Sequence, residues 1–202
     1  MAIWAAEARV LVRPFRAYGL LRASNVDAGA SDLVIALRRP FAWLLSMGAF
    51  VSLSGAGRLV FFHQLFGMAA WIFVPLLQML WLMIALSAVS KRDRGPRSID
   101  LFFAGEAHWF LLLFLLTGVC LFLPDAWRAF QWLFQTQILP IAVLLACIWS
   151  VVVTFAFFRS GLAWTRAQSF KGLGIYYGGF ASTIVCYYLL MGQLIPLIRG
   201  SS

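Results

Sequence analysis

The chain has 202 residues, of which 63% are hydrophobic and 11% charged, and it carries a formal net charge of +9. A soluble domain is closer to half apolar and a quarter charged, so the composition excludes a water-soluble fold of this size. The basic residues lie in the breaks between apolar runs, which favours contact with anionic membrane lipids and argues against nucleic acid as a partner.

Residues 1–39 form a basic segment that we expect to lie on the cytoplasmic face of the membrane. Two short helices separated near Pro14 are predicted, followed by a third that Ser31 or Asp32 caps and that ends before Pro40. Arginines at helical spacing would face the lipid headgroups while apolar side chains face the acyl boundary. The expected headgroup-binding residues are Arg9, Arg13, Arg16, Arg38 and Arg39.

Residues 40–202 are expected to form an all-α transmembrane bundle. About 20 residues are needed to cross the hydrocarbon core, and the sequence holds five apolar runs of at least that length. The runs cover residues 41–62, 65–89, 101–123, 132–158 and 173–198. The break between the first two is the shortest, so a single re-entrant hairpin there is the alternative.

The distribution of charge predicts the orientation of the five spans. Basic residues precede the first run and fill the breaks after the second and fourth runs, whereas Arg58, Arg128 and Arg199 fall on the other side. Cytoplasmic loops carry the excess of Lys and Arg, so the N-terminus is predicted inside and the C-terminus outside. The expected location is the cytoplasmic (inner) membrane of a bacterium.

Two prolines are predicted to break helices inside the bilayer. Pro75 has Gln78 three residues after it, and Pro140 has Gln137 three residues before it. A proline leaves the carbonyl four residues earlier without its donor, and in lipid that carbonyl needs another partner. The four residues either line a substrate path between broken helices or are kinks in a static bundle.

Small residues recur every four positions on the first and fifth spans. They are Gly48, Ser52 and Ala56 on the first, and Gly178, Ser182 and Cys186 on the fifth. This spacing lets helix backbones approach closely, either within the bundle or against a second protein.

Asp100, Glu106 and His108 gather where the third span begins. We expect Glu106 to pair with a cation of the adjacent basic loop, residues 91–97, and so to anchor the end of this span. The alternative is a catalytic group, because acids at the membrane are often functional. His63 is expected on the opposite face and the cysteines are scattered singly, so neither a haem, a metal nor another cofactor is predicted.

The sequence resembles a bacterial member of the Yip1-domain family. The resemblance rests on the basic N-terminal region, the five spans, and the segments Trp-Ile-Phe-Val-Pro-Leu-Leu-Gln (71–78) and Asp-Leu-Phe-Phe-Ala-Gly (100–105). It covers about residues 30–198 and implies a non-enzymatic, membrane-organising protein. The Asp-Leu-Tyr-Gly-Pro motif of eukaryotic relatives is absent, so a Rab-type GTPase partner is not implied.

These patterns predict a non-catalytic protein that organises or scaffolds membrane lipids, other integral membrane subunits or further copies of itself. The first alternative is a transporter or channel component with a path near Pro75, Gln78, Gln137 and Pro140. The second is a membrane enzyme that uses Asp100, Glu106 and His108. Whether these polar groups converge in the fold distinguishes the three.

Overall fold

The computed structural model describes residues 3–23, 31–90, 93, 95–122 and 126–199, and within these ranges the regular elements are helices. Four helical stretches are long and apolar enough to cross a membrane: Asp32–Ala56, Phe61–Val89, Pro96–Val119 and Ile138–Gly161. The predicted all-helical class is therefore confirmed, and the chain has the helices of a membrane protein. The fifth predicted span falls on α10 (Arg166–Arg199), which is not among these four, so the number of spans and their orientation stay predictions.

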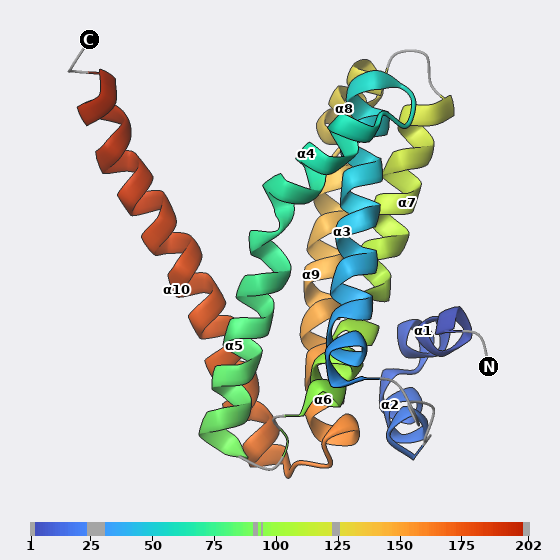
Figure 1. The fold of residues 1–202 in the computed structure, drawn as a ribbon, viewed down its shortest axis with the longest axis vertical. Coiled ribbons are helices and arrows are strands. Elements are labelled where there is room, and N and C mark those ends of the chain that lie inside the picture. The colour runs from blue at the N-terminus through green and yellow to red at the C-terminus, as the bar shows by residue number, and fades with distance from the viewer. Residues whose placement is uncertain (1–2, 24–30, 91–92, 94, 123–125, 200–202) are drawn as a thin grey trace.

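The basic N-terminal segment forms two short helices, α1 (Ile3–Val12) and α2 (Pro14–Ala23). Pro14 occupies the first turn of α2, where its missing N–H costs no helical hydrogen bond. Val10 and Tyr18 are fully buried, whereas the arginines of both helices are exposed. Figure 1 shows both helices beside the lower end of the bundle. They are therefore anchored by one apolar side and present a cationic side outward.

The first long helix, α3 (Asp32–Ala56), runs without interruption through Pro40. Ser31 caps it by accepting a hydrogen bond from the Val34 N–H at 3.5 Å, and Gly57 ends it with a positive φ of 65°. The prediction of a separate short helix ending before Pro40 is therefore wrong, and the expected boundary at residue 40 falls inside α3. A proline removes one hydrogen bond of a helix, and the packing of the surrounding turns outweighs that loss here.

The second apolar run is divided into α4 (Phe61–Trp71) and α5 (Phe73–Val89). The break at Ile72 lies one turn before Pro75, whose ring replaces the N–H that would bind the Trp71 carbonyl. This is the kink that the sequence predicts. It redirects the chain, so that α4 packs on α3 while α5 packs on α10.

The third run comprises α6 (Pro96–Phe103), the 3₁₀ turn η2 (Ala104–Glu106) and α7 (Ala107–Phe122). The fourth comprises α8 (Ala126–Gln135), α9 (Ile138–Ala156) and the π-helical turn η3 (Phe157–Gly161). Gln137 separates α8 from α9 with a φ of 62°, so this residue lies in a break between two helices.

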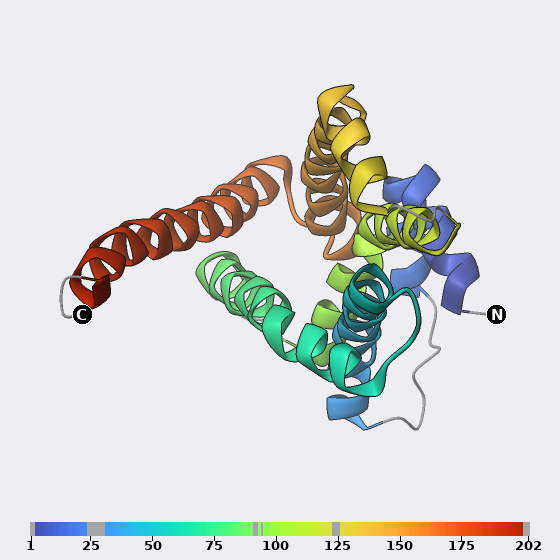
Figure 2. The same ribbon diagram turned by 90° about the horizontal axis from the view of Figure 1, so that it is seen from above.

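Figure 1 shows α3, α7 and α9 running side by side, with α4 and α8 at their upper end. The first turns of α6 and α10 lie at the lower end, together with α1, α2 and the start of α3. Seen from above in Figure 2, α10 extends away from this group. Trp81 joins α10 to α5, because its ring lies against Gly179 and its indole N–H donates to the Thr183 hydroxyl at 3.0 Å.

The main core lies at the lower end of the bundle. It is built from aromatic side chains of several elements, among them Tyr18, Phe102, Phe103, Phe157, Phe158 and Tyr176. Their rings meet mainly edge to face, as in the contact of Phe102 with Phe157 at 5.5 Å between centroids. Large apolar side chains on α4, α7 and α9 are exposed, as expected for helices whose solvent is lipid.

Candidate functional site

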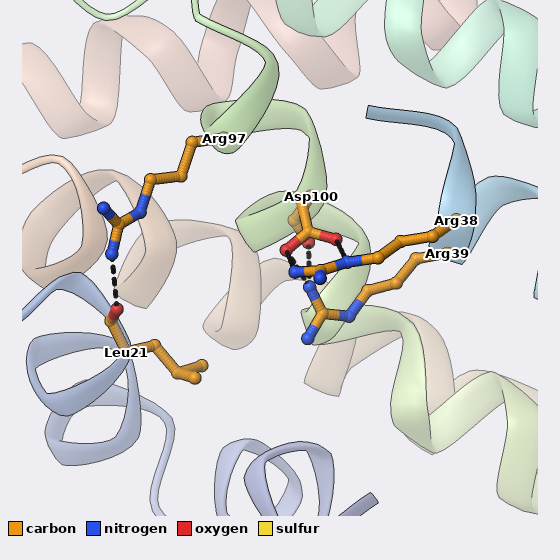
Figure 3. Close-up of polar contacts among 5 residues, drawn as sticks. All are labelled: Leu21, Arg38, Arg39, Arg97 and Asp100. Carbon is orange, nitrogen blue, oxygen red and sulfur yellow. Dashed lines mark hydrogen bonds and ion pairs between the residues drawn. The ribbon is translucent and has the colours of Figure 1, made fainter. Parts of the chain in front are cut away.

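An ion-paired cluster lies where α3 meets α6. The Asp100 carboxylate accepts two parallel hydrogen bonds from Arg38, at 2.6 Å from Nε and 2.5 Å from Nη2, and a further one from Arg39 (Figure 3). Arg39 also donates to the Asp100 carbonyl oxygen at 3.1 Å. The side chain of Asp100 is 3% exposed and that of Arg39 is 9% exposed. One buried carboxylate is therefore shared by two guanidinium groups, and the ion pairs join the two helices.

Arg97, on the first turn of α6, binds the end of α2. Its Nη2 donates to the Leu21 carbonyl oxygen at 3.2 Å (Figure 3). The same atom donates to the Arg22 carbonyl oxygen at 3.3 Å. The last carbonyls of a helix lack intrahelical donors and carry partial negative charge, so a guanidinium group there is favourable. This contact, like that at Asp100, fixes the N-terminal basic segment to the third span.

Glu106 lies at the end of η2 and is 7% exposed. Its carboxyl group lies near the side chain of Gln78 of α5, and Gln78 also lies near the Tyr176 hydroxyl of α10. The structure shows no ion pair to Glu106 among the residues it describes. Of the basic loop expected to pair with it, Lys91, Arg92 and Arg94 lie outside the described residues, and Arg97 binds α2. The expected pairing of Glu106 with this loop therefore stays a prediction, and the ion pairs that the structure does show at the start of the third span are those of Asp100 with Arg38 and Arg39.

Tyr18 of α2 reaches the same region. Its hydroxyl is buried without a hydrogen-bond partner and lies so close to Gly105 that a Cβ there would collide with the oxygen. Burial raises the pKa of Tyr18 far above its ordinary value, and the nearby Glu106 acts in the same direction, so the hydroxyl stays protonated. The Gln78 Oε1 atom is a second buried polar atom without a partner.

His108 joins α7 to α9 through a chain of hydrogen bonds. Its Nδ1 lies 3.0 Å from the Gly105 carbonyl oxygen, and its Nε2 lies 2.6 Å from the Ser150 hydroxyl. Ser150 also accepts from the Trp109 indole N–H at 2.9 Å. The donors and acceptors match when Nδ1 carries the proton and Ser150 donates to Nε2. Both ring nitrogens are then satisfied, Nδ1 by the preceding turn η2 and Nε2 by α9.

The structure separates several residues that the sequence analysis grouped. Asp100 binds arginines of α3, Glu106 lies beside Gln78, and His108 binds Ser150, so each of the three meets a different neighbouring element. Gln137 is exposed at the start of α9 and Pro140 follows one turn later, whereas Gln78 is buried beside Glu106. Among the described residues, no group of three or more His, Cys, Asp or Glu side chains lies close enough to hold a metal ion.

The two stripes of small residues also differ. Gly48 lies against α4, and Ser52 is fully buried with its hydroxyl accepting from the Val60 N–H at 2.7 Å; Ala56 is the last residue of α3. Gly178 has no atom within 4 Å of a Cβ position, and Ser182 is exposed and bonds its own helix. The first stripe packs within the bundle, and the second faces outward.

The expected headgroup-binding arginines fall into two groups. Arg9, Arg13 and Arg16 are exposed on α1 and α2, whereas Arg38 and Arg39 are used by Asp100. Sequence reasoning also missed Tyr18, Tyr176 and Ser150. No pattern along the chain marks them, because each is joined to its partner only by the packing of helices far apart in sequence.

No protein-family model matches the chain, and no curated protein or solved structure shows significant similarity to it.

Proposed function

We propose that this protein is a non-catalytic membrane bundle that organises membrane lipids or other integral membrane proteins. The observation that carries the proposal is how the buried polar groups are used. Asp100 binds arginines of α3, Glu106 lies beside Gln78 of α5, and His108 binds Ser150 of α9, so each of the three packs against a different helix. The cationic side of α1 and α2 remains exposed, which is where a protein of this kind meets lipid or a partner. The resemblance to the Yip1-domain family points the same way.

The proposal places five spans in a bacterial inner membrane, with the N-terminus inside. It is supported by the position of the basic helix ends, since α1, α2, the start of α3 and the first turns of α6 and α10 share one end of the bundle (Figure 1). Arg58 and Arg128 lie in the segments at the other end.

Cysteine labelling in intact cells tests this orientation. In a cysteine-free background, a Ser202→Cys variant should react with an impermeant maleimide, because the predicted C-terminus is outside. A Ser24→Cys variant should react only after the membrane is opened. Labelling of Ser24→Cys and protection of Ser202→Cys in intact cells would reverse the assignment.

The proposed function itself is tested in native membranes. The full chain is extracted with its surrounding lipid into polymer nanodiscs, and the retained lipids and proteins are identified by mass spectrometry. A reproducible set that differs from the bulk membrane supports the proposal. A chain retained alone, with lipid of bulk composition, contradicts it.

A transport path is the second candidate function, and one observation favours it. Gln78, Glu106 and Tyr18 converge from three helical elements, and two of their polar atoms have no partner. The path would run along α5 and would not include Gln137 or Pro140. Ion or solute flux into vesicles that contain the purified chain would support this candidate over the first.

Substitutions of Glu106 separate these two candidates. Glu106→Gln keeps an acceptor for Gln78 and adds a donor that can bind Gln78 Oε1, so the unfolding free energy should change by less than about 1 kcal/mol. Glu106→Leu leaves the buried amide unpaired and should cost about 1–3 kcal/mol. Chemical unfolding in micelles measures both. Under the first candidate, Glu106→Gln retains its lipids and partners; a stable Glu106→Gln chain that has lost them shows that the carboxyl group is functional.

A further inference from the structure

An apolar groove runs between α1, α3 and α7. It has a volume of about 430 Å³, and the residues that line it include Ala8, Leu11, Ala49, Phe110, Phe114 and Thr117. Phe114 is 75% exposed. The one hydroxyl that α3 contributes, that of Ser46, donates to the Ala42 carbonyl at 3.0 Å, so its hydrogen is already used. The groove therefore offers an almost wholly apolar surface beside two candidate membrane-spanning helices.

A second hollow, of about 570 Å³, lies on α1 and α2. Three arginines line it, Arg9, Arg13 and Arg16, together with the apolar side chains of Val12 and Leu20. Arg13 and Arg16 are exposed and have no acidic partner within the described ranges of the chain. Ala8 lines both hollows, so the cationic one adjoins the apolar one.

We propose that the two hollows together form a binding site for an anionic phospholipid. One acyl chain lies in the groove between α3 and α7, and the headgroup phosphate binds Arg13 and Arg16. The two parts of the site match the two parts of this ligand: an apolar chain within the bilayer and a negative charge at its surface. A guanidinium group binds phosphate through paired N–H donors, so arginine suits this contact better than lysine does.

The charge at the headgroup gives the site its selectivity. In a bilayer the acyl chain leaves one apolar environment for another, so the groove contributes packing and orientation more than hydrophobic transfer. Each cation near an anionic membrane surface contributes about 1 kcal/mol, so losing two arginines should reduce the preference for anionic over zwitterionic lipid by roughly tenfold or more. The inference deepens the proposed function and rests on it, since it names one lipid class that the bundle holds.

Native mass spectrometry of the purified full chain tests the site. The protein in detergent micelles is titrated with phosphatidylglycerol and with phosphatidylcholine that carries the same acyl chains. The wild-type chain should bind phosphatidylglycerol preferentially. The double variant Arg13→Gln/Arg16→Gln should lose most of that preference. Arg22→Gln is the matched control, because Arg22 is exposed on the same helix and does not line the hollow.

The groove is tested separately. Ala49→Phe fills it and should weaken the binding of both lipids severalfold, whereas Ala181→Phe, at an exposed site on α10, should not. If Ala49→Phe fails to fold, Leu111→Trp replaces it as the groove-filling variant, because Leu111 lines the groove and is 47% exposed. It should also weaken the binding of both lipids.

Three results would overturn the site: equal binding of the two lipids by the wild-type chain, an equal loss in Arg22→Gln and the double variant, or full binding by folded groove-filling variants. The last two would indicate surface charge without a site. If the lipid site fails but nanodiscs still retain a reproducible set of partner proteins, the proposed function stands. Failure of the site and failure of the proposed function are therefore distinguishable.

Discussion

Replacing Asp100 with asparagine should lower the free energy of unfolding by about 3–5 kcal/mol, the range found when one partner of a buried ion pair is removed. The substitution keeps the shape of the side chain but removes its charge. Arg39 then remains buried beside a neutral amide. The amide has one acceptor oxygen where the carboxylate has two, so it cannot accept both of the parallel hydrogen bonds that Arg38 donates. The Arg38 side chain is 28% exposed, so water screens its attraction to Asp100. Most of the lost stability should therefore come from the ion pair with Arg39.

Chemical unfolding of purified protein in micelles measures this effect, with helical circular dichroism as the signal. Asp32→Asn is the matched control, because Asp32 is exposed in the first turn of the same α3 helix that carries the two arginines. Losing its interaction with the helix N-terminus should cost less than about 1 kcal/mol. If Asp100→Asn and Asp32→Asn behave alike, the buried cluster does not hold α3 against α6.

A replacement of the whole cluster distinguishes lost charge from lost packing. A triple variant in which Asp100, Arg38 and Arg39 become apolar residues of similar volume removes every buried charge at once. Such replacements are often neutral or stabilising. The triple variant should therefore recover much of the stability that Asp100→Asn loses, even though it has more substitutions.

The sequence predicted the positions of the helices better than their ends. The break before Pro75 follows directly from the missing N–H of proline, and the structure places it at Ile72. Pro40 has the same chemistry but does not end α3. The difference lies in tertiary contacts: the turn at Pro40 holds Arg38 and Arg39 against Asp100, and no local pattern announces a partner 61 or 62 positions away.

The polar cluster was predictable in its members but not in its pairing. Gln78 and Glu106 each stood out as polar residues beside apolar runs, yet the sequence assigned Gln78 to a proline kink and Glu106 to a basic loop. Both assignments used neighbours along the chain. The packing of α5 and η2 brings the two side chains together. Gln137, in contrast, is exposed at the turn between α8 and α9. One signal did lie in the sequence: two adjacent arginines at the start of an apolar run need an acid when they are buried.

Gly48 is a position where an added side chain should disturb the contact between two helix backbones. A Cβ at this position would lie 2.6 Å from the Gln64 carbonyl oxygen and 2.7 Å from Met68 Cγ. Gly67 of α4 is also tightly packed from the other side, since its Cβ would lie 2.8 Å from Val51 Cβ and 3.1 Å from the Gly48 Cα. The carbonyl belongs to the backbone of α4, so a larger residue must push the two helices apart.

Gly48→Leu should therefore lower the unfolding free energy by about 1–3 kcal/mol or more, or prevent folding altogether. Gly55→Leu is the control on the same helix, because a Cβ there meets no atom within 4 Å. Thermal unfolding and the yield of monodisperse protein report the difference. Similar losses in both variants would show that the contact between α3 and α4 has no special dependence on Gly48.

A smaller pair of substitutions keeps the test informative if Gly48→Leu does not fold. Alanine favours a helix over glycine by about 1 kcal/mol, so Gly118→Ala should stabilise the protein, because its Cβ enters open space within α7. Gly48→Ala gains the same helix propensity but places its Cβ against the α4 backbone, so the net effect should be zero or destabilising. The sign of the difference between these two alanine variants then measures how closely α3 and α4 must approach. A Gly48→Ala chain as stabilised as Gly118→Ala would contradict the close approach.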